Sequence, residues 1–175
     1  MELLNKIEKV ALGWVKDVPH LPVTTQKWIA QNVWWITLVF AVIGGLGVLY
    51  SLNNLFLLIA SLESVSRAYV MTTTFVEFAI VKQIISIVLS VMIVVTLALA
   101  INPLKQKQKK GWVLLFLALL LEVILVVIGA LLSLSIFGFI VSVIFGAIFL
   151  GALAYFLFEI HSQFAHPVKR DFSKK

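Results

Sequence analysis

Four long stretches of the chain are apolar at nearly every position, and polar residues are concentrated between them. The stretches are residues 33–52, 83–101, 112–132 and 136–158. A hydrocarbon core about 30 Å thick is crossed by about 20 helical residues, so each stretch is long enough to span a bilayer. Membrane β-strands would alternate apolar and polar residues, which these stretches do not do. The pattern predicts an all-α integral membrane protein with four transmembrane helices in an antiparallel bundle, residues 33–158.

Polar and proline positions predict where these helices end. Residues 112–158 would form one helix about 70 Å long if nothing interrupted them, more than twice the core thickness. Ser133 and Ser135 interrupt the run, and their hydroxyl groups can satisfy backbone groups that a turn leaves free. After the second stretch, Pro103 disfavours the α conformation of Asn102. We therefore expect a tight turn at 132–135 and a helix end at Asn102.

The segments outside the four stretches are more polar. In residues 1–32 an apolar helical face lies opposite glutamates and lysines, which predicts an N-terminal amphipathic helix on the membrane surface. Packing of that helix against the protein's own loops is the alternative. Residues 53–74 repeat the helical spacing and predict an interfacial helix between the first two spans, with a break at residues 72–74. Residues 159–175 are predicted to be a basic, solvated tail.

Positive charge predicts the orientation. The chain has 14 Lys and Arg against 8 Asp and Glu, a net charge of +6. Most of it lies in the N-terminal segment, the C-terminal tail and the loop between the second and third spans. By the positive-inside rule all three are cytoplasmic, which predicts a multi-pass protein of the plasma (inner) membrane. The charge favours contact with anionic lipid rather than nucleic acid. The loop lysines are Lys105, Lys107, Lys109 and Lys110.

Composition and aromatic positions support a membrane protein. Hydrophobic residues make up 62% of the chain and charged residues 13%, whereas soluble domains are about half apolar and a quarter charged. Tryptophan and tyrosine occur at the ends of the predicted spans, as in interfacial belts. Plain apolar packing is the alternative for these aromatic residues, which are Trp34, Trp35, Tyr50, Trp112 and Tyr155.

The chain contains few of the residue types that catalysis or cofactor binding requires. The chain has no cysteine, which excludes a thiol relay. Its histidines, His20, His161 and His166, lie outside the spans, which argues against haem ligation within the membrane. His161 and His166 could bind a metal, but a solvated tail is the favoured interpretation. We expect no enzymatic activity and no cofactor.

One charged residue lies inside a span. Glu122 is about ten residues from either end of the third stretch, near the bilayer midplane, where ionisable residues usually face protein or water. The same depth is predicted for Ser90 and for small residues of the first and fourth spans. A structural clamp, in which Ser90 hydrogen-bonds Glu122, is favoured over a proton or cation site.

Small residues predict close helix packing. Spacings of four residues between them let two helix backbones approach. Contacts within one chain are favoured over contacts between copies. The residues are Gly44, Gly45, Gly47, Gly138, Ser142, Gly146 and Gly151.

The sequence as a whole predicts a small polytopic membrane protein of structural, assembly or accessory-subunit type. The alternative is a small transporter or channel component that uses Glu122 as a proton or cation site. Expected partners are the lipid bilayer and a homo-oligomer or larger membrane complex.

Overall fold

The computed structural model describes Lys6, Val10, Gly13 and residues 19–66, 70–133 and 135–165, without the side chains of 62–74. The predicted N-terminal amphipathic helix therefore lies almost wholly outside the described residues. So does the basic part of the predicted C-terminal tail.

The described residues from 19 onward form four long helices and one short helix. They are α2 (Val23–Ser66), α3 (Val70–Lys105), α4 (Lys109–Leu131), α5 (Ile136–Glu159) and α6 (His161–Ala165). The four long helices are each long and apolar enough to cross a membrane. The prediction of an all-helical, multi-pass membrane protein is confirmed at this level.

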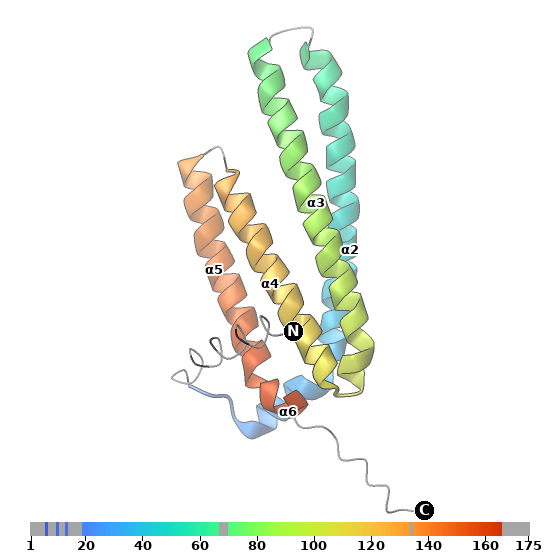
Figure 1. The fold of residues 1–175 in the computed structure, drawn as a ribbon, viewed down its shortest axis with the longest axis vertical. Helices are drawn as coiled ribbons and strands as arrows, with labels where there is room; N and C mark the ends of the chain where they lie inside the picture. The colour runs from blue at the N-terminus through green and yellow to red at the C-terminus, as the bar shows by residue number, and fades with distance from the viewer. Residues whose placement is uncertain are drawn as a thin grey trace, which may run out of the picture.

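The long helices are arranged in chain order. Each packs against the next, while α6 contacts α2, α4 and α5. Helices α2 and α5, at the two sides of the series, share little direct contact. Figure 1 shows the α2–α3 and α4–α5 pairs close together at one end and apart at the other. We call the first end, which carries Lys105 and Lys109, the lysine end, and the opposite one the far end.

The two helix pairs differ in length. Helices α4 and α5 have 23 and 24 residues, about 35 Å each, which matches the thickness of a bilayer. Helices α2 and α3 have 44 and 36 residues, about 66 and 54 Å. The α2–α3 pair therefore runs well past the α4–α5 turn (Figure 1). We call its described part beyond that level, residues 53–61 and 75–82, the hairpin extension.

The predicted separate helix between the first two spans is not found. Helix α2 continues to Ser66, and α3 already begins at Val70 and runs through residues 72–74 without a break. Residues 48–102 contain neither glycine nor proline, so no residue in this segment stops a helix strongly. Threonines at 72–74 lower helix propensity only slightly, and the prediction of a break there was wrong.

The other turns are close to their predicted places. Helix α4 ends at Leu131 and α5 begins at Ile136, which confirms the turn at 132–135. The Ser135 hydroxyl caps α5 by accepting a hydrogen bond from the Gly138 N–H at 3.2 Å. Helix α3 runs to Lys105, past the predicted end, with Pro103 in its last turn. A proline there interrupts only the end of the hydrogen-bond ladder.

Buried side chains gather at the lysine end. Trp112 is 1% exposed and contacts apolar residues from the ends of the other helices. Two predictions fail there. Trp112 lies in the core rather than in an interfacial belt, and the predicted solvated tail begins with buried residues because α6 packs back onto the helices. The buried residues of that segment are Glu159, Ile160 and Phe164.

Candidate functional sites along the helix row

Glu122 lies near the middle of α4 and is half-buried. Within the part of the chain that the structure describes, no residue forms a hydrogen bond or an ion pair with its carboxyl group. Ser90 of α3 is half-buried as well, but its hydroxyl does not hydrogen-bond Glu122. Both residues thus lie within apolar helices, but the predicted hydrogen bond between Ser90 and Glu122 is not formed.

The neighbours of Glu122 on its helix face show which helix it lies beside. Val126 follows one turn later on the same face of α4. A methyl group placed on Gly146 of α5 would lie 2.4 Å from Cγ1 of Val126. The α5 backbone therefore comes very close to α4 at this level, and Glu122 lies next to the α4–α5 contact.

The predicted packing glycines divide into two groups. A methyl group on Gly44 would lie 2.9 Å from Val94, and one on Gly138 would lie 2.7 Å from the Ser133 hydroxyl, so these glycines, like Gly146, allow close contacts within the chain. Ser142 is half-buried. In the second group, a methyl group added to the glycine would have no atom within 4 Å. This group consists of Gly45, Gly47 and Gly151. The helix surface at these three glycines is therefore not covered by another part of the described chain.

A polar cluster that the sequence did not reveal lies at the lysine end. Glu159, the last residue of α5, is 4% exposed. Its carboxylate accepts hydrogen bonds from His20 Nδ1 at 2.7 Å, from the Leu21 N–H at 2.9 Å and from Gln26 Nε2 at 2.9 Å. We call these four residues the Glu159 clamp. Because three donors come from the segment before α2 and from its first turn, the clamp joins the two outermost helices of the row.

Two further contacts hold the same segment. Gln26 Nε2 also donates to the Leu21 carbonyl at 3.0 Å, and the Tyr155 hydroxyl donates to the Pro19 carbonyl at 2.8 Å. The segment therefore lies across the end of α5 with both its backbone and its side chains bound.

The electrostatic state of Glu159 follows from these contacts. Glu159 follows the predicted span 136–158 and is the last residue of α5, at the lysine end. Burial raises the pKa of its carboxyl group. Hydrogen bonds from His20, Leu21 and Gln26 lower this pKa by more than burial raises it, so the pKa is below its usual value of 4.5. The carboxylate is therefore ionised at neutral pH and has all its donors in place. Such a saturated carboxylate suits a structural role better than proton transfer.

Trp112 is the centre of the apolar packing beside the clamp. Its indole Nε1 donates a hydrogen bond to the Leu157 carbonyl at 2.8 Å. Its ring stacks on Phe116, with centroids 5.4 Å apart, and meets His161 of α6 edge-on at 4.6 Å. The N-terminal end of α4 is thereby fixed to the last turn of α5 and to α6.

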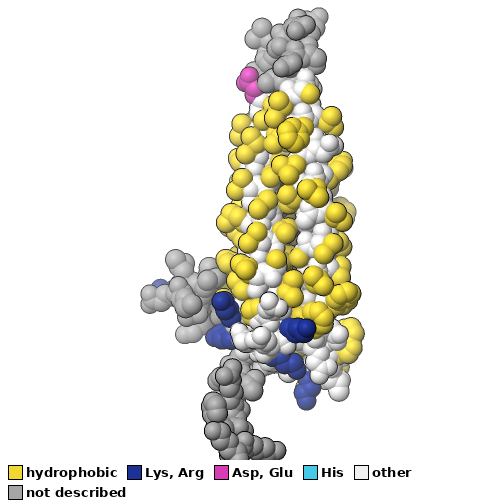
Figure 2. All heavy atoms as spheres, turned by 90° about the vertical axis from the view of Figure 1, so that its right-hand side faces the viewer, with side chains coloured by type: hydrophobic (Ala, Val, Ile, Leu, Met, Phe, Trp, Pro, Cys, Tyr) yellow, Lys and Arg dark blue, Asp and Glu magenta, His cyan; other side chains and the backbone are white. Residues whose placement is uncertain are grey.

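The four loop lysines are exposed and lie together at one end of the molecule (Figure 2). Lys105 Nζ lies 5.3 Å from the ring centroid of Trp34, within range of a cation–π interaction. Lys107 has a positive φ of 52° in the turn between α3 and α4. The turn is short, so these charges stay close to the ends of both helices.

The hairpin extension begins at a polar level. Gln83 Nε2 of α3 donates to the Ser51 carbonyl of α2 at 3.1 Å, and Asn53 and Asn54 lie next to this contact in sequence. Beyond it, large apolar side chains are exposed again. They are Phe56, Leu57, Ile59, Phe75 and Val81. Figure 2 shows apolar side chains along nearly the whole described face of this helix pair.

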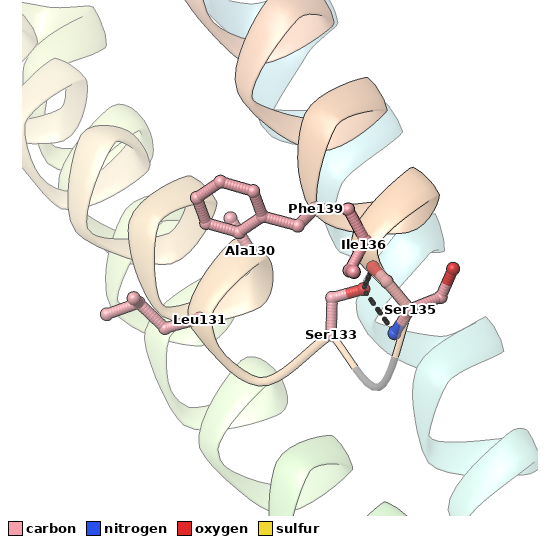
Figure 3. Close-up of a pocket in the computed structure, with 6 residues that line it drawn as sticks. All are labelled: Ala130, Leu131, Ser133, Ser135, Ile136 and Phe139. Carbon is pink, nitrogen blue, oxygen red and sulfur yellow. Dashed lines mark hydrogen bonds between the residues drawn. The ribbon is translucent and has the colours of Figure 1, made fainter.

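Two shallow hollows lie away from the lysine end, one at the α4–α5 turn and one on the α2–α3 pair. One is formed at that turn by Ala130, Ser133, Ser135 and Phe139 with their neighbours (Figure 3). There the Ser133 hydroxyl donates to the Ser135 carbonyl at 3.0 Å, so it is used within the turn. The other lies on the hairpin extension and is lined by Asn54, Leu57, Leu58, Ser61 and Gln83. Glu122 lines neither hollow.

Among the residues described, no three His, Asp or Glu side chains lie together as a metal site would require. The predicted alternative of a site at His161 and His166 includes His166, which is outside the described residues. No family model, curated protein or solved structure matches this chain.

Proposed function

We propose that this chain is a structural, assembly or accessory subunit of a larger assembly in the plasma (inner) membrane. It crosses the bilayer as four antiparallel helices, with both termini and the lysine end in the cytoplasm. The observation that carries the proposal is the position of Glu122, half-buried on α4 without a hydrogen-bonding partner among the described residues.

An acidic residue at the centre of a membrane helix costs about 2.5 to 3.5 kcal/mol on insertion scales. A hydrogen bond from a neighbouring helix reduces this cost, and such bonds contribute about 0.6 kcal/mol on average. Since the described chain supplies no such bond to Glu122, a helix of another subunit is the partner that we propose.

The surface around Glu122 supports contact with another helix. Gly129 lies two turns along the same face of α4, and a methyl group there would meet nothing within 4 Å. A methyl group on Gly151 of α5 would likewise have no atom within 4 Å. Small residues of this kind let a second backbone approach closely in lipid.

The lysine end supports the proposed orientation. Four exposed lysines and the exposed rings of Trp28 and Trp35 lie at this end of the helix row. Lysine together with tryptophan is typical of a cytoplasmic membrane surface rich in anionic lipid. We propose anionic lipid as the second partner, without catalytic chemistry or a cofactor.

Site-specific crosslinking in native membranes tests the docking proposal. A photoreactive residue at Leu125, one turn from Glu122, should give a protein adduct of defined mass. The adduct should persist with Glu122→Gln, which keeps hydrogen bonding, and disappear with Glu122→Leu. A photoreactive residue at Leu99, which is 62% exposed on α3, is the matched control. Equal adducts at both positions, or none at Leu125, would contradict the proposal.

A transporter or channel component centred on Glu122 is the second candidate. It is favoured by the partial exposure of this carboxyl group at mid-membrane depth, where an ion or proton could reach it. Flux in proteoliposomes should then be lost with Glu122→Gln and kept with Glu77→Gln, which changes an exposed carboxyl group outside the spans. Glutamate-dependent flux of this kind would overturn the accessory-subunit proposal.

A further inference from the structure

Lys105 of α3 and Trp34 of α2 join two helices at the lysine end. The Lys105 Nζ lies 5.3 Å from the centroid of the Trp34 ring, so a cation–π interaction holds the ammonium group beside the indole. Lys105 is exposed and Trp34 is half-buried. Among the described residues, Lys105 forms no ion pair and no hydrogen bond, so its ammonium group has donors left for a ligand.

Two further donors lie on the same face of α2 as Trp34. Lys27 and Gln31 precede Trp34 by seven and three residues, which are the spacings of neighbours on one helix face. Both are exposed. Lys27 forms no ion pair with a described residue, and neither the Gln31 amide nor the Trp34 Nε1–H makes a hydrogen bond with one. Two ammonium groups, an amide and an indole N–H are therefore available to a ligand on adjoining parts of α2 and α3.

These groups lie where the apolar parts of α2 and α3 end. The predicted span of α2 begins at Val33, and that of α3 ends at Ile101, four residues before Lys105. Lys27 and Trp34 are about 10 Å apart along the helix axis. The headgroup layer on each side of a bilayer is about 5 to 8 Å thick. When both helices cross a membrane, the donors therefore lie at the level of the lipid phosphates.

The charge of this surface favours an anionic phospholipid. Glu159 is the one acidic residue at the lysine end whose side chain the structure describes, and its carboxylate is already bound within the Glu159 clamp. Lysine ammonium groups bind phosphate, and amide and indole N–H groups add hydrogen bonds. Residues 35–50 of α2, beyond Trp34, are almost all apolar, so acyl chains can lie along them. A free phosphate ion would leave this apolar surface unused.

We propose that Lys27, Gln31, Trp34 and Lys105 bind the phosphate group of one anionic phospholipid at the contact between α2 and α3. This inference deepens the proposed function, since it rests on the lysine end facing anionic lipid and names the residues that bind one such molecule. The site differs from a diffuse attraction of all exposed lysines, because Trp34 holds the Lys105 ammonium group in position. No described aromatic ring lies over the other three loop lysines.

Native mass spectrometry of the full-length chain in detergent tests the site. One molecule of phosphatidylglycerol, which is anionic, should bind more strongly than zwitterionic phosphatidylcholine. Lys105→Gln should weaken phosphatidylglycerol binding by about tenfold, the loss expected for one charge-assisted hydrogen bond. Lys105→Arg keeps the charge and the contact with the ring, so it should retain binding. The charge-matched comparison is Lys109→Gln, which removes only screened, long-range attraction and should weaken binding far less.

Trp34→Leu is an independent variant, because it leaves every charge in place. It should weaken phosphatidylglycerol binding, since the Lys105 ammonium group loses the ring that holds it and the indole N–H is gone. Thermal unfolding of each variant shows whether it is folded. Full binding by a folded Trp34→Leu variant would contradict the proposed site.

The remaining outcomes separate this site from the proposed function. Equal weakening by Lys105→Gln and Lys109→Gln would overturn the site and leave the attraction of the lysine end for anionic lipid in place. Equal binding of the two phospholipids to the native chain would overturn both. Displacement of the bound lipid by inorganic phosphate would overturn a phospholipid as the ligand. Crosslinking at Leu125 decides the accessory role separately.

Discussion

The Glu159 carboxylate accepts a hydrogen bond from the backbone N–H of Leu21 at 2.9 Å, although 138 residues separate the two along the chain. His20 and Gln26 bind the same buried carboxylate, and its sequence neighbours Phe158 and Ile160 belong to the apolar cluster around Trp112. This contact ties the segment before α2 to the end of α5, and the helix row is thereby joined at the lysine end.

Replacing the carboxylate should destabilise this end of the molecule. Glu159→Ala leaves the part-buried Leu21 N–H without its acceptor. A fully buried unsatisfied group costs about 1 to 3 kcal/mol, so we expect a cost at the lower end of this range. We expect a clear loss in the free energy of unfolding, measured in detergent by chemical denaturation. Glu77→Gln removes an exposed charge and should change this energy by less than about 0.5 kcal/mol. Equal changes in the free energy of unfolding for the two variants would contradict the prediction that the Glu159 clamp stabilises the lysine end.

The clamp should depend on pH in one direction. The pKa of Glu159 in the folded protein is below its usual value of 4.5, because the hydrogen bonds from His20, Leu21 and Gln26 outweigh the effect of burial. A carboxyl group with a lowered pKa contributes its stability fully above the usual value and loses it as the pH falls through the folded pKa. Thermal unfolding of the native chain should therefore show an added loss of stability below pH 4.5 that Glu159→Gln lacks.

Two glycines of α5 form a matched pair. Gly146→Ala would place a methyl group 2.4 Å from Val126, and overpacking of this kind costs about 1 to 3 kcal/mol. Gly151→Ala meets open space and should be neutral or stabilising, since alanine favours a helix over glycine by about 1 kcal/mol. Combining Gly146→Ala with Val126→Ala should restore part of the lost stability. No recovery in thermal unfolding would show that the two side chains are not in contact.

Trp112 should contribute far more to stability than a tryptophan at the surface. Trp112→Phe loses the hydrogen bond from Nε1 to the Leu157 carbonyl, worth about 1 kcal/mol, and leaves that volume partly empty. Trp35→Phe changes an exposed ring and should have little effect on unfolding. If the Trp112 ring instead faced the lipid interface, the two substitutions would give similar denaturation curves.

The sequence by itself determined the long helices and the turn at 132–135. Their signals are local. About 20 apolar residues in a row are enough to predict a span, and Ser133 and Ser135 interrupt such a row where the chain must reverse. The local reading failed at residues 53–74, where the polar residues are compatible with a helix and α2 simply continues.

Only the tertiary structure decided which helix faces meet. The long helices are apolar on all sides, so no polar face shows which side packs against protein and which faces lipid. Gly44 and Gly146 pack within the chain while Gly45 and Gly151 remain open, although all four are small residues in apolar surroundings. Glu159 is buried because three donors from a distant segment meet it, a coincidence in space that spacing along the chain does not encode.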